Sequence, residues 1–346
     1  MPRGFGPSAG LDALRVTNAI LPLESYDDRP GYDPGFVLQS HPLPLPGPGR
    51  WADDLVHLIP EARQQGRDDS ELRYTHFSVR MAQSRALPLC SACNIDGSRS
   101  DHSVPRSDIW RRDPRIDTGL QNLNEGYGHD HQGLFSRGHM TRRKDPNWGP
   151  PEIAQRADAD TFHITNAAPQ RQGFNAGIWL ALEDYVLDNT DRANLKVTVI
   201  TGPILSLDDP VYYNRRIPTA FWKILAFVHA GTGALTTIGY RRSQMDYLSR
   251  PAGGRFVFGD FRDSQVPVRA IAQESGLDLA AYAELDVMAG AGPEMEIRVA
   301  QHRRFLSVAL SRKRLSHPAP ESRATGCTRP AAREWCRGCG PDQGQG

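Results

Sequence analysis

The feature that most constrains the fold of this 346-residue chain is the pattern of residues 134–186. Residues 134–140 have the pattern of a strand that leads into a basic loop. Residues 161–165 predict a second short strand, and from Phe174 onward apolar residues recur with helical spacing. Two strands, an intervening loop and a helix together predict a ββα unit.

The flanking sequence predicts a larger sheet around this unit. Residues 266–272 suggest a strand or loop that runs into a short helix. Four further strands are predicted. Residues 74–81 alternate loosely, and residues 86–95 form a short apolar run bounded by Asp96-Gly97. Residues 195–201 are rich in β-branched residues, and residues 220–228 form another apolar run that follows turn residues. The expected fold is therefore α/β (α+β), with a central mixed or antiparallel sheet flanked by helices.

Composition divides the chain into three parts. Residues 1–65 are rich in Pro and Gly and predict a partly ordered N-terminal extension. Residues 66–290 carry the predicted sheet and form the expected main domain. Residues 291–346 combine a basic segment with a tail that we expect to be disordered, which contains Cys327, Cys336 and Cys339.

Charge and cysteine content limit the class of protein. The formal net charge is only +1, so nucleic-acid affinity would have to come from local basic patches. The first 20 residues lack the apolar core of a signal peptide, and no run of about 18 apolar residues predicts a membrane span. Five cysteines, an odd number, favour reduced thiols. These observations predict a cytoplasmic protein with no membrane partner.

His139 is a candidate general base, because an imidazole titrates near pH ~6.5. Arg137 lies two residues earlier on the same face of the predicted strand, and a neighbouring cation favours the neutral ring that a base needs. The alternative is a structural histidine, one of eleven in the chain. Arg142, Arg143 and Lys144 follow in the loop and are candidates for binding nucleic-acid phosphates.

Asn175 and Glu183 are candidate oxygen ligands on the predicted helix. The amide oxygen of Asn175 suits a hard divalent cation. Glu183 lies roughly 12 Å further along the axis at ~1.5 Å per residue, so it would reach a metal-bound water rather than the metal. The alternatives are an N-capping asparagine and a surface glutamate. A base, cationic groups and these ligands together indicate metal-assisted hydrolysis of a phosphodiester.

Two segments, SRGHMTRRKDPNWG at 136–149 and TNAAPQRQGFNAGIWLALE at 165–183, carry a resemblance. They are similar to the DNA/RNA non-specific endonuclease family, the endonuclease G type of His-Me finger (ββα-metal) nucleases. That family is marked by a DRGH motif, an asparagine with Pro-Gln, and N-x-x-x-W-x-x-L-E. Further similar pieces are YTHFSVRMAQSRALPLCSACNIDG, ITGPIL, IPTAFWKI, and QVPV with GLD. The resemblance covers roughly residues 70–285 and implies a ββα-metal (His-Me finger) active site.

The resemblance implies a role for each matching residue. His139 matches the general base, and Asn175 matches the single protein ligand of Mg²⁺, for which Mn²⁺ can substitute. Glu183 matches the helix acid that holds a metal-bound water. The remaining matches are Arg137 and Arg85, placed against phosphates, and Asn166, with an orienting role.

The same resemblance implies a reaction and its substrates. Water attacks the phosphodiester under His139, and the products carry 5′-phosphate ends. Such enzymes contact the backbone rather than base edges, which implies DNA and also RNA as substrates, with little sequence preference. Family members are often homodimers.

Ser136 departs from the family pattern, which has aspartate at this position. A serine supplies no charge, so the alternative is a catalytically weak nucleic-acid-binding or scaffold protein that retains the nuclease fold. A further hypothesis is an immune or toxin-type effector that is held inactive by a regulatory protein partner. Residues 1–65 or the C-terminal tail would then mediate control.

Overall fold

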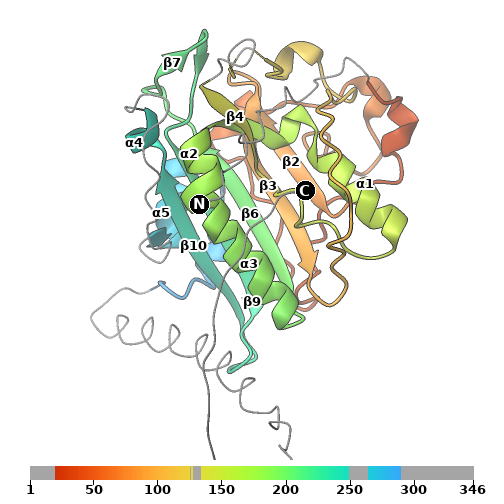
Figure 1. Ribbon diagram of the computed structural model, residues 1–346, viewed down its shortest axis with the longest axis vertical. Helices are drawn as coiled ribbons and strands as arrows, with labels where there is room; N and C mark the ends of the chain where they lie inside the picture. Colours follow the sequence, from red (N-terminus) through yellow and green to blue (C-terminus); the bar gives the residue numbers. More distant parts are fainter. Residues whose placement is uncertain (1–19, 125, 128–133, 249–263, 290–346) are drawn as a thin grey trace, which may run out of the picture. The chain divides into compact units, whose positions relative to one another are not determined.

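Seven strands form one antiparallel sheet at the centre of the fold (Figure 1). The computed structural model describes residues 20–124, 126–127, 134–248 and 264–289, all within one compact unit that spans residues 1–299. In sheet order, the strands are β1 (Leu72–Arg73), β2 (Phe77–Ala82), β3 (Leu87–Asp96), β6 (Lys196–Ile204), β9 (Ala220–Val228), β10 (Leu235–Ser243) and β11 (Gln265–Val266).

The central strands β3, β6 and β9 are buried almost throughout. β-Branched and aromatic residues favour the strand form of β6 and β9. Gly202 allows β6 to approach its neighbours closely. A Cβ at this position would lie 2.4 Å from the Leu89 carbonyl oxygen and 2.8 Å from the Trp222 ring. The strand therefore continues through Gly202 and Pro203, beyond the end at residue 201 that the sequence predicts.

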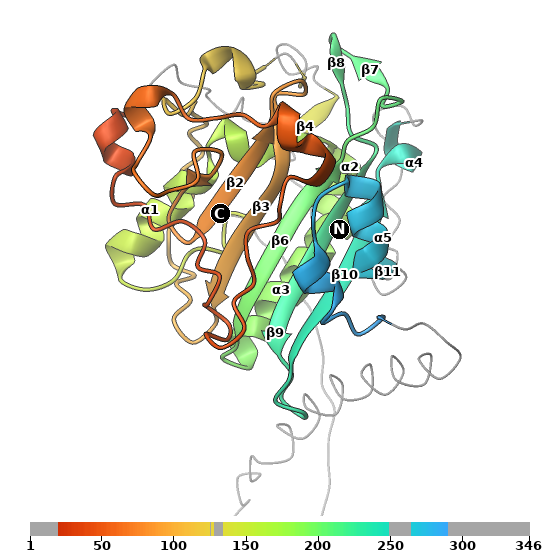
Figure 2. The ribbon, with the colours of Figure 1, turned by 180° about the vertical axis from the view of Figure 1, so that it is seen from behind.

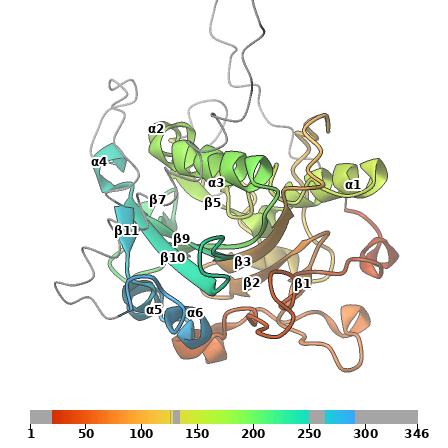
Figure 3. The same cartoon turned by 90° about the horizontal axis from the view of Figure 1, so that it is seen from below.

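Different elements cover the two faces of the sheet (Figures 1 and 3). One face carries α1 (Pro151–Thr161), α3 (Leu180–Arg192) and the hairpin formed by β4 (Phe135–His139) and β5 (Ala167–Arg171). The other face carries α5 (Val268–Ser275), α6 (Ala280–Ala283) and the N-terminal segment (Figures 2 and 3). The smaller elements are η1 (Leu23–Tyr26), η2 (Gly49–Asp54), η3 (Pro60–Ala62), η4 (Thr118–Leu120), β7 (Val211–Tyr212), β8 (Arg215–Arg216) and α4 (Met245–Leu248).

The predicted ββα unit is present. β4 and β5 pair antiparallel, with His139 opposite Ala167. The chain then forms the short helix α2 (Gln172–Phe174), a π-helical turn η6 (Asn175–Trp179) and α3. Gly177 has non-helical backbone angles, so the helix is kinked just after Asn175. The predicted fold class, a sheet flanked by helices with this unit, is confirmed, and the sheet is antiparallel.

The predicted strand at residues 161–165 is wrong. These residues contain the end of α1 and most of the turn η5 (Ile164–Asn166), and the second strand of the hairpin is β5. The Thr161 hydroxyl donates to the Asp158 carbonyl at 2.7 Å, a local bond that competes with strand pairing. Pro151 supplies the fixed φ that suits a first helical turn, so a helix precedes this turn.

Residues 20–65 pack onto the sheet. Tyr26, Tyr32, Leu43 and Val56 are buried and belong to the main hydrophobic core. The Val56 N–H donates to the Met81 carbonyl at 3.0 Å, beside the edge of β2. The domain limits at residues 65 and 290 stay predictions, because residues 290–346, including the cysteine-containing tail, lie outside the described residues. None of the helices in the described ranges combines the length and apolar character needed to cross a bilayer.

Candidate active site

His139 is the last residue of β4, and its half-buried ring lies between two aromatic side chains. The ring centroids of Trp110 and Phe162 lie 4.8 and 5.1 Å from that of His139. Its Nε2 is buried and has no hydrogen-bond partner in the described part of the chain. Burial lowers the pKa of His139 to about 3, so the ring is neutral at pH 7. Nearby guanidinium groups lower this pKa further, in the order Arg106, Arg143, Arg142.

Arg137 is not among these arginines, although strand spacing predicts that it favours the neutral ring. Its Nη2 donates to the Leu123 carbonyl at 2.9 Å and to Asn124 Oδ1 at 2.7 Å. The guanidinium carbon lies 4.8 Å from the centroid of the Tyr127 ring. Arg137 thus anchors the loop before β4, and its buried Nε has no hydrogen-bond partner among the described residues.

Asn166 fixes the backbone that follows His139. Its Oδ1 accepts a bond from the Thr141 N–H at 2.9 Å, and its Nδ2 donates to the carbonyls of Thr141 at 2.9 Å and Thr161 at 3.0 Å. The Met140 N–H donates to the Asn166 carbonyl at 2.8 Å. Because Asn166 is fully buried, these four bonds define the path of the chain at the end of β4. The orienting role predicted for Asn166 agrees with this geometry and stays a prediction.

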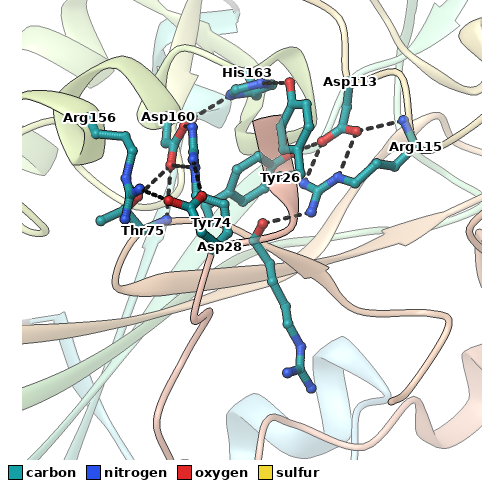
Figure 4. A network of polar contacts seen from close by, with 11 residues as sticks. Tyr26, Asp28, Tyr74, Thr75, Asp113, Arg115, Arg156, Asp160 and His163 are labelled. Atoms are coloured by element: carbon teal, nitrogen blue, oxygen red, sulfur yellow. Dashed lines mark hydrogen bonds and ion pairs between the residues drawn. The ribbon is translucent and has the colours of Figure 1, made fainter. Parts of the chain in front are cut away.

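A buried polar network supports the turn that carries Asn166 (Figure 4). His163 Nδ1 lies 2.8 Å from the Asp160 carbonyl oxygen, which can only accept, so this nitrogen is the protonated one. His163 Nε2 therefore accepts from the Tyr26 hydroxyl at 2.7 Å. Burial lowers the pKa of His163 to about 4. Through Tyr26, the N-terminal segment contacts the residue that directly precedes η5.

An ion pair forms the second half of this network (Figure 4). Arg115 Nη2 lies 2.7 Å from Asp113 Oδ2. Burial raises the pKa of Asp113, but Arg115 outweighs burial and brings this pKa to about 2. The Tyr74 hydroxyl donates to Asp113 at 2.5 Å and lies 2.6 Å from the Thr165 hydroxyl. The network thus joins the residue that follows β1, the loop at residue 113 and η5.

Asn175 and Glu183 lie on the helical part of the ββα unit. Asn175 begins η6 and is half-buried, and its side chain makes no hydrogen bond to another described residue. Glu183 is buried in the first turn of α3. Its Oε2 is 3.9 Å from Arg142 Nε, and its Oε1 is 3.6 Å from Lys223 Nζ. Burial raises the pKa of Glu183, and Lys223 and then Arg142 oppose this rise.

The basic loop after β4 is braced by acidic residues. Arg142 pairs with Asp184 on α3, and Arg143 Nη1 lies 2.5 Å from Asp158 on α1. Lys144 is half-buried in the same loop. Because Arg142 follows His139 by three residues, its contacts with α3 hold the strand and helix portions of the site together. The nucleic-acid contacts predicted for this loop stay predictions.

Arg85 lies in the turn between β2 and β3 and points toward the base of the β7–β8 hairpin. Its Nη2 is 2.6 Å from Asp209 Oδ2 and also donates to the Arg216 carbonyl, and its Nη1 donates to the Ser206 carbonyl. These contacts bring Arg85 to the hairpin rather than to His139. Its predicted role against a phosphate stays a prediction.

Ser136 faces the start of the helical portion. Its hydroxyl donates to Gln172 Oε1 at the first residue of α2. Gln170 is the strand partner of Ser136, and two residues further along β4 Gly138 makes room for its side chain, because a Cβ at 138 would lie 2.1 Å from Gln170 Oε1. Gln170 is fully buried, and neither polar atom of its amide has a hydrogen-bond partner within the described ranges.

Sequence reasoning missed three residues that shape this site, namely Trp110, Gln170 and Lys223. Lys223 carried a usable signal, since a lysine stands inside the apolar run of β9. Gln170 lies in the Pro-Gln pair that the sequence analysis noted without assigning a role. Trp110 stands in a long polar segment and shows no local pattern that points to His139.

The side chains at the site fit a hard divalent cation. The described residues contain no group of three or more His, Cys, Asp and Glu side chains that could hold a metal. The prediction, however, names an amide oxygen as the one protein ligand. Asn175 has that oxygen available, and the buried Oε1 of Glu183 has no hydrogen-bond partner among the described residues. These oxygen donors suit Mg²⁺, which keeps much of its hydration shell in protein sites.

Comparison with known proteins places these observations in a wider context. The family model described as DNA/RNA non-specific endonuclease matches residues 57–285. The uncharacterized protein y4fB of Sinorhizobium fredii is 38% identical over 275 residues, which cover 76% of this chain and 40% of that protein. Human mitochondrial endonuclease G is 31% identical over 141 residues, covering 36% and 46% of the two chains.

Mouse mitochondrial nuclease EXOG is 27% identical over 133 residues, covering 38% of this chain and 34% of that protein. The chain therefore spans less than half the length of these curated relatives. The crystal structure of the EndoG/EndoGI complex contains a chain that is 20% identical, with a TM-score of 0.49. That match covers 63% of this chain and 87% of the other.

Proposed function

Because the chain belongs to the DNA/RNA non-specific endonuclease family, we propose that it is a metal-dependent endonuclease that cleaves DNA and RNA without sequence specificity. The observation that best supports this proposal is the His139 ring. It is neutral at pH 7, and the segment that follows it is fixed by the four bonds of Asn166.

His139 acts as the general base in this proposal. A base must be unprotonated, and burial among aromatic rings satisfies this condition. Since Nε2 has no exposed surface, the nitrogen that receives the proton from the attacking water is Nδ1. The bonds from Asn166 hold this ring in place, because they fix the two residues that follow it.

Asn175 would hold one Mg²⁺ ion, and Glu183 would accept hydrogen bonds from the waters around it. When bound, the ion neutralises charge that develops on the phosphate and assists departure of the 3′-oxygen, so that 5′-phosphate ends remain. Arg142 and Lys223 balance the charge of Glu183. Cationic groups that contact phosphates rather than base edges give little sequence preference.

The experiment that tests this function is cleavage of plasmid DNA and of RNA by the purified protein. We expect cleavage in Mg²⁺ and in Mn²⁺ and none in EDTA. His139→Ala should lower the rate by about 10²–10⁴-fold, the usual contribution of a general base. Exposed His41→Ala is the matched control and should retain full activity. The DNA products should be joined by a ligase without prior phosphorylation, which reports 5′-phosphate ends.

A second variant, Ser136→Asp, is included because the family pattern has aspartate where this chain has Ser136. If the wild-type protein is folded and cleaves nothing in either metal, the aspartate variant decides the case. Cleavage by Ser136→Asp would show an intact site weakened at one position. Nucleic-acid binding without cleavage by either protein would overturn the proposed activity in favour of a binding protein.

A further inference from the structure

Lys223 is a fully buried lysine on β9, near the middle of the sheet and directly beneath α3. Its Nζ lies 2.7 Å from the Thr201 hydroxyl, 3.6 Å from Glu183 Oε1 and 5.3 Å from the centroid of the Trp179 ring. Its strand neighbours Trp222 and Ile224 are fully buried and apolar. A lysine here is therefore an isolated charge in an otherwise hydrophobic strand.

Burying an ammonium group is unfavourable unless a carboxylate compensates for its lost hydration. The Thr201 hydroxyl is neutral and the Trp179 ring contributes only a weak attraction. The carboxylate within ion-pair distance of Lys223 is Glu183. Asp145 lies close enough to Lys223 to be influenced by its charge, so two acids face Lys223 and Arg142 in this buried cluster.

Glu183 receives one cation at each oxygen atom. Arg142 lies on the Oε2 side at 3.9 Å and Lys223 on the Oε1 side at 3.6 Å. Both distances exceed the roughly 2.7–3.2 Å of an N–H···O hydrogen bond. Elsewhere in the same loop an arginine does form a close bond, since Arg143 Nη1 lies 2.5 Å from Asp158. The charge of Glu183 is thus balanced while its buried Oε1 makes no hydrogen bond within the described ranges.

We propose that Lys223 is a positioning residue that acts through Glu183. Its charge holds the buried Oε1 of Glu183 at the floor of the site, so that the other oxygen, Oε2, is the one that would accept hydrogen bonds from water. This inference rests on the proposed function, because it names a residue that supports the same site. Lys223 itself touches neither substrate nor cation, since it is enclosed between β9 and α3.

A purely structural role makes a different prediction from a positioning role. Removing one partner of a buried ion pair costs about 3–5 kcal/mol of stability, whereas replacing both charged partners is often neutral or stabilising. A lysine with a purely structural role would therefore lower the melting temperature when it is replaced by methionine, but it would leave kcat of the folded protein unchanged. If the lysine acts through Glu183, its replacement should lower kcat when Glu183 is present and should leave kcat nearly unchanged when Glu183 is absent.

The test is a double-mutant cycle with Lys223→Met, Glu183→Gln and the double variant. Lys223→Met should lower kcat for a DNA fragment in Mg²⁺ by about 10–100-fold and change KM by less than about 3-fold, because the residue lies behind the helix. In the Glu183→Gln background, the same substitution should change kcat by less than about 3-fold. Lys196→Met, an exposed lysine of the same sheet, is the matched control and should match the wild type.

A second readout does not depend on turnover. Mn²⁺ is titrated into each metal-free protein and the melting temperature is followed. Lys223→Met should weaken Mn²⁺ binding by about 5–10-fold, and it should have no further effect in the Glu183→Gln background. A Lys223→Met protein that melts like the wild type but binds Mn²⁺ more weakly supports positioning. Unchanged Mn²⁺ binding and unchanged kcat in Lys223→Met would overturn the inference.

Failure of the inference and failure of the proposed function give different results. If the wild-type protein does not cleave, the proposed function fails, and the Mn²⁺ titration still decides the role of Lys223. If Lys223→Met does not fold, the isosteric double variant, in which both charges are absent, should fold. If Lys223→Met lowers kcat by the same factor with and without Glu183, the lysine acts through another group, and the inference is overturned.

Discussion

At the residue scale, burial holds several histidine rings neutral. The pKa values of His76 and His163 fall to about 4 and that of His139 to about 3, with burial as the largest cause in each case. In the unfolded chain each ring titrates near ~6.5. Between these pH values the unfolded chain binds protons that the folded protein does not bind. Each ring therefore makes the folded protein less stable as the pH falls below about 6.5.

His163→Gln isolates one of these rings and tests this sign. Glutamine can still accept from Tyr26 and donate to the Asp160 carbonyl, but it does not titrate. Between pH 7 and pH 5 the wild-type protein should lose about 2 kcal/mol more unfolding free energy than the variant, because only its ring takes up a proton on unfolding. Urea unfolding at several pH values measures the difference. Near pH 7.5 the His163 ring is neutral in the folded and the unfolded protein. The difference in unfolding free energy between wild type and variant at this pH therefore reports only altered hydrogen bonds.

Parallel pH dependence of the two proteins would contradict this assignment. The comparison must be a difference between variants, because the pKa of buried Asp145 is raised to about 7, mainly by burial. A raised carboxyl pKa acts in the opposite sense, since the folded protein then binds the extra proton and gains stability as the pH falls. Both proteins share this contribution, so it cancels in the difference.

The same scale shows which site residues sequence can predict. His139, Asn166, Asn175 and Glu183 lie within one ββα unit, where local spacing already suggests their grouping. Lys223 reaches Glu183 only because β9 is placed beneath α3 by the strand order of the sheet. No local pattern encodes that order. The contacts of Arg85 were not predictable for the same reason, since its ion pair with Asp209 joins two turns that are distant in sequence.

At the element scale, the β4–β5 hairpin depends on a close approach between its two strands. The Gln170 side chain crosses over Gly138, and a Cβ at 138 would meet Oε1 at 2.1 Å and Cδ at 2.2 Å. Gln170 is fully buried, so it has no open space to move into. The glycine of the SRGH segment is therefore required by its cross-strand neighbour rather than by a turn.

Gly138→Ala should destabilise the protein by about 1–3 kcal/mol, the usual cost of overpacking a buried site. In a Gln170→Ala background, where the clash is absent, the same substitution should cost less than about 1 kcal/mol. Urea unfolding of the four proteins measures both values. If Gly138→Ala costs the same in both backgrounds, the side chain of Gln170 is not the cause.

The strands β6 and β9 could be predicted from sequence, whereas β5 could not, and the reasons are different. β6 and β9 are recognisable because β-branched and aromatic residues fill them. β5 escaped recognition because its sequence, AAPQR, contains a proline and no β-branched residue, and its strand form depends on pairing with β4. Residues 161–165, where a strand was wrongly predicted, include types that favour strands, but the side chains of Thr161 and His163 hydrogen-bond locally to backbone carbonyls.

At the scale of the whole molecule, the N-terminal segment packs against the domain that carries the candidate site. The effector hypothesis instead treats this segment as a regulator of that site. Residues 20–65 contribute Tyr26, Tyr32, Leu43 and Val56 to the main core. Tyr26 also bonds His163, next to the turn that carries Asn166. A segment with these contacts resembles part of the domain more than a removable inhibitor. The effector hypothesis therefore needs a test that separates loss of inhibition from loss of the fold.

Two truncations, of residues 1–19 and of residues 1–65, provide that test. Burial of each large apolar side chain contributes about 1.5–3 kcal/mol, and folded domains have only about 5–15 kcal/mol in total. Removing residues 1–65 deletes several such side chains, so this protein should lose cooperative unfolding and all cleavage activity. Removing residues 1–19 leaves the described contacts intact and should preserve the melting temperature. Circular dichroism melting and plasmid cleavage measure both. A truncation at residue 65 that melts like the full chain and cleaves faster would contradict this packing argument and support an inhibitory N-terminal segment.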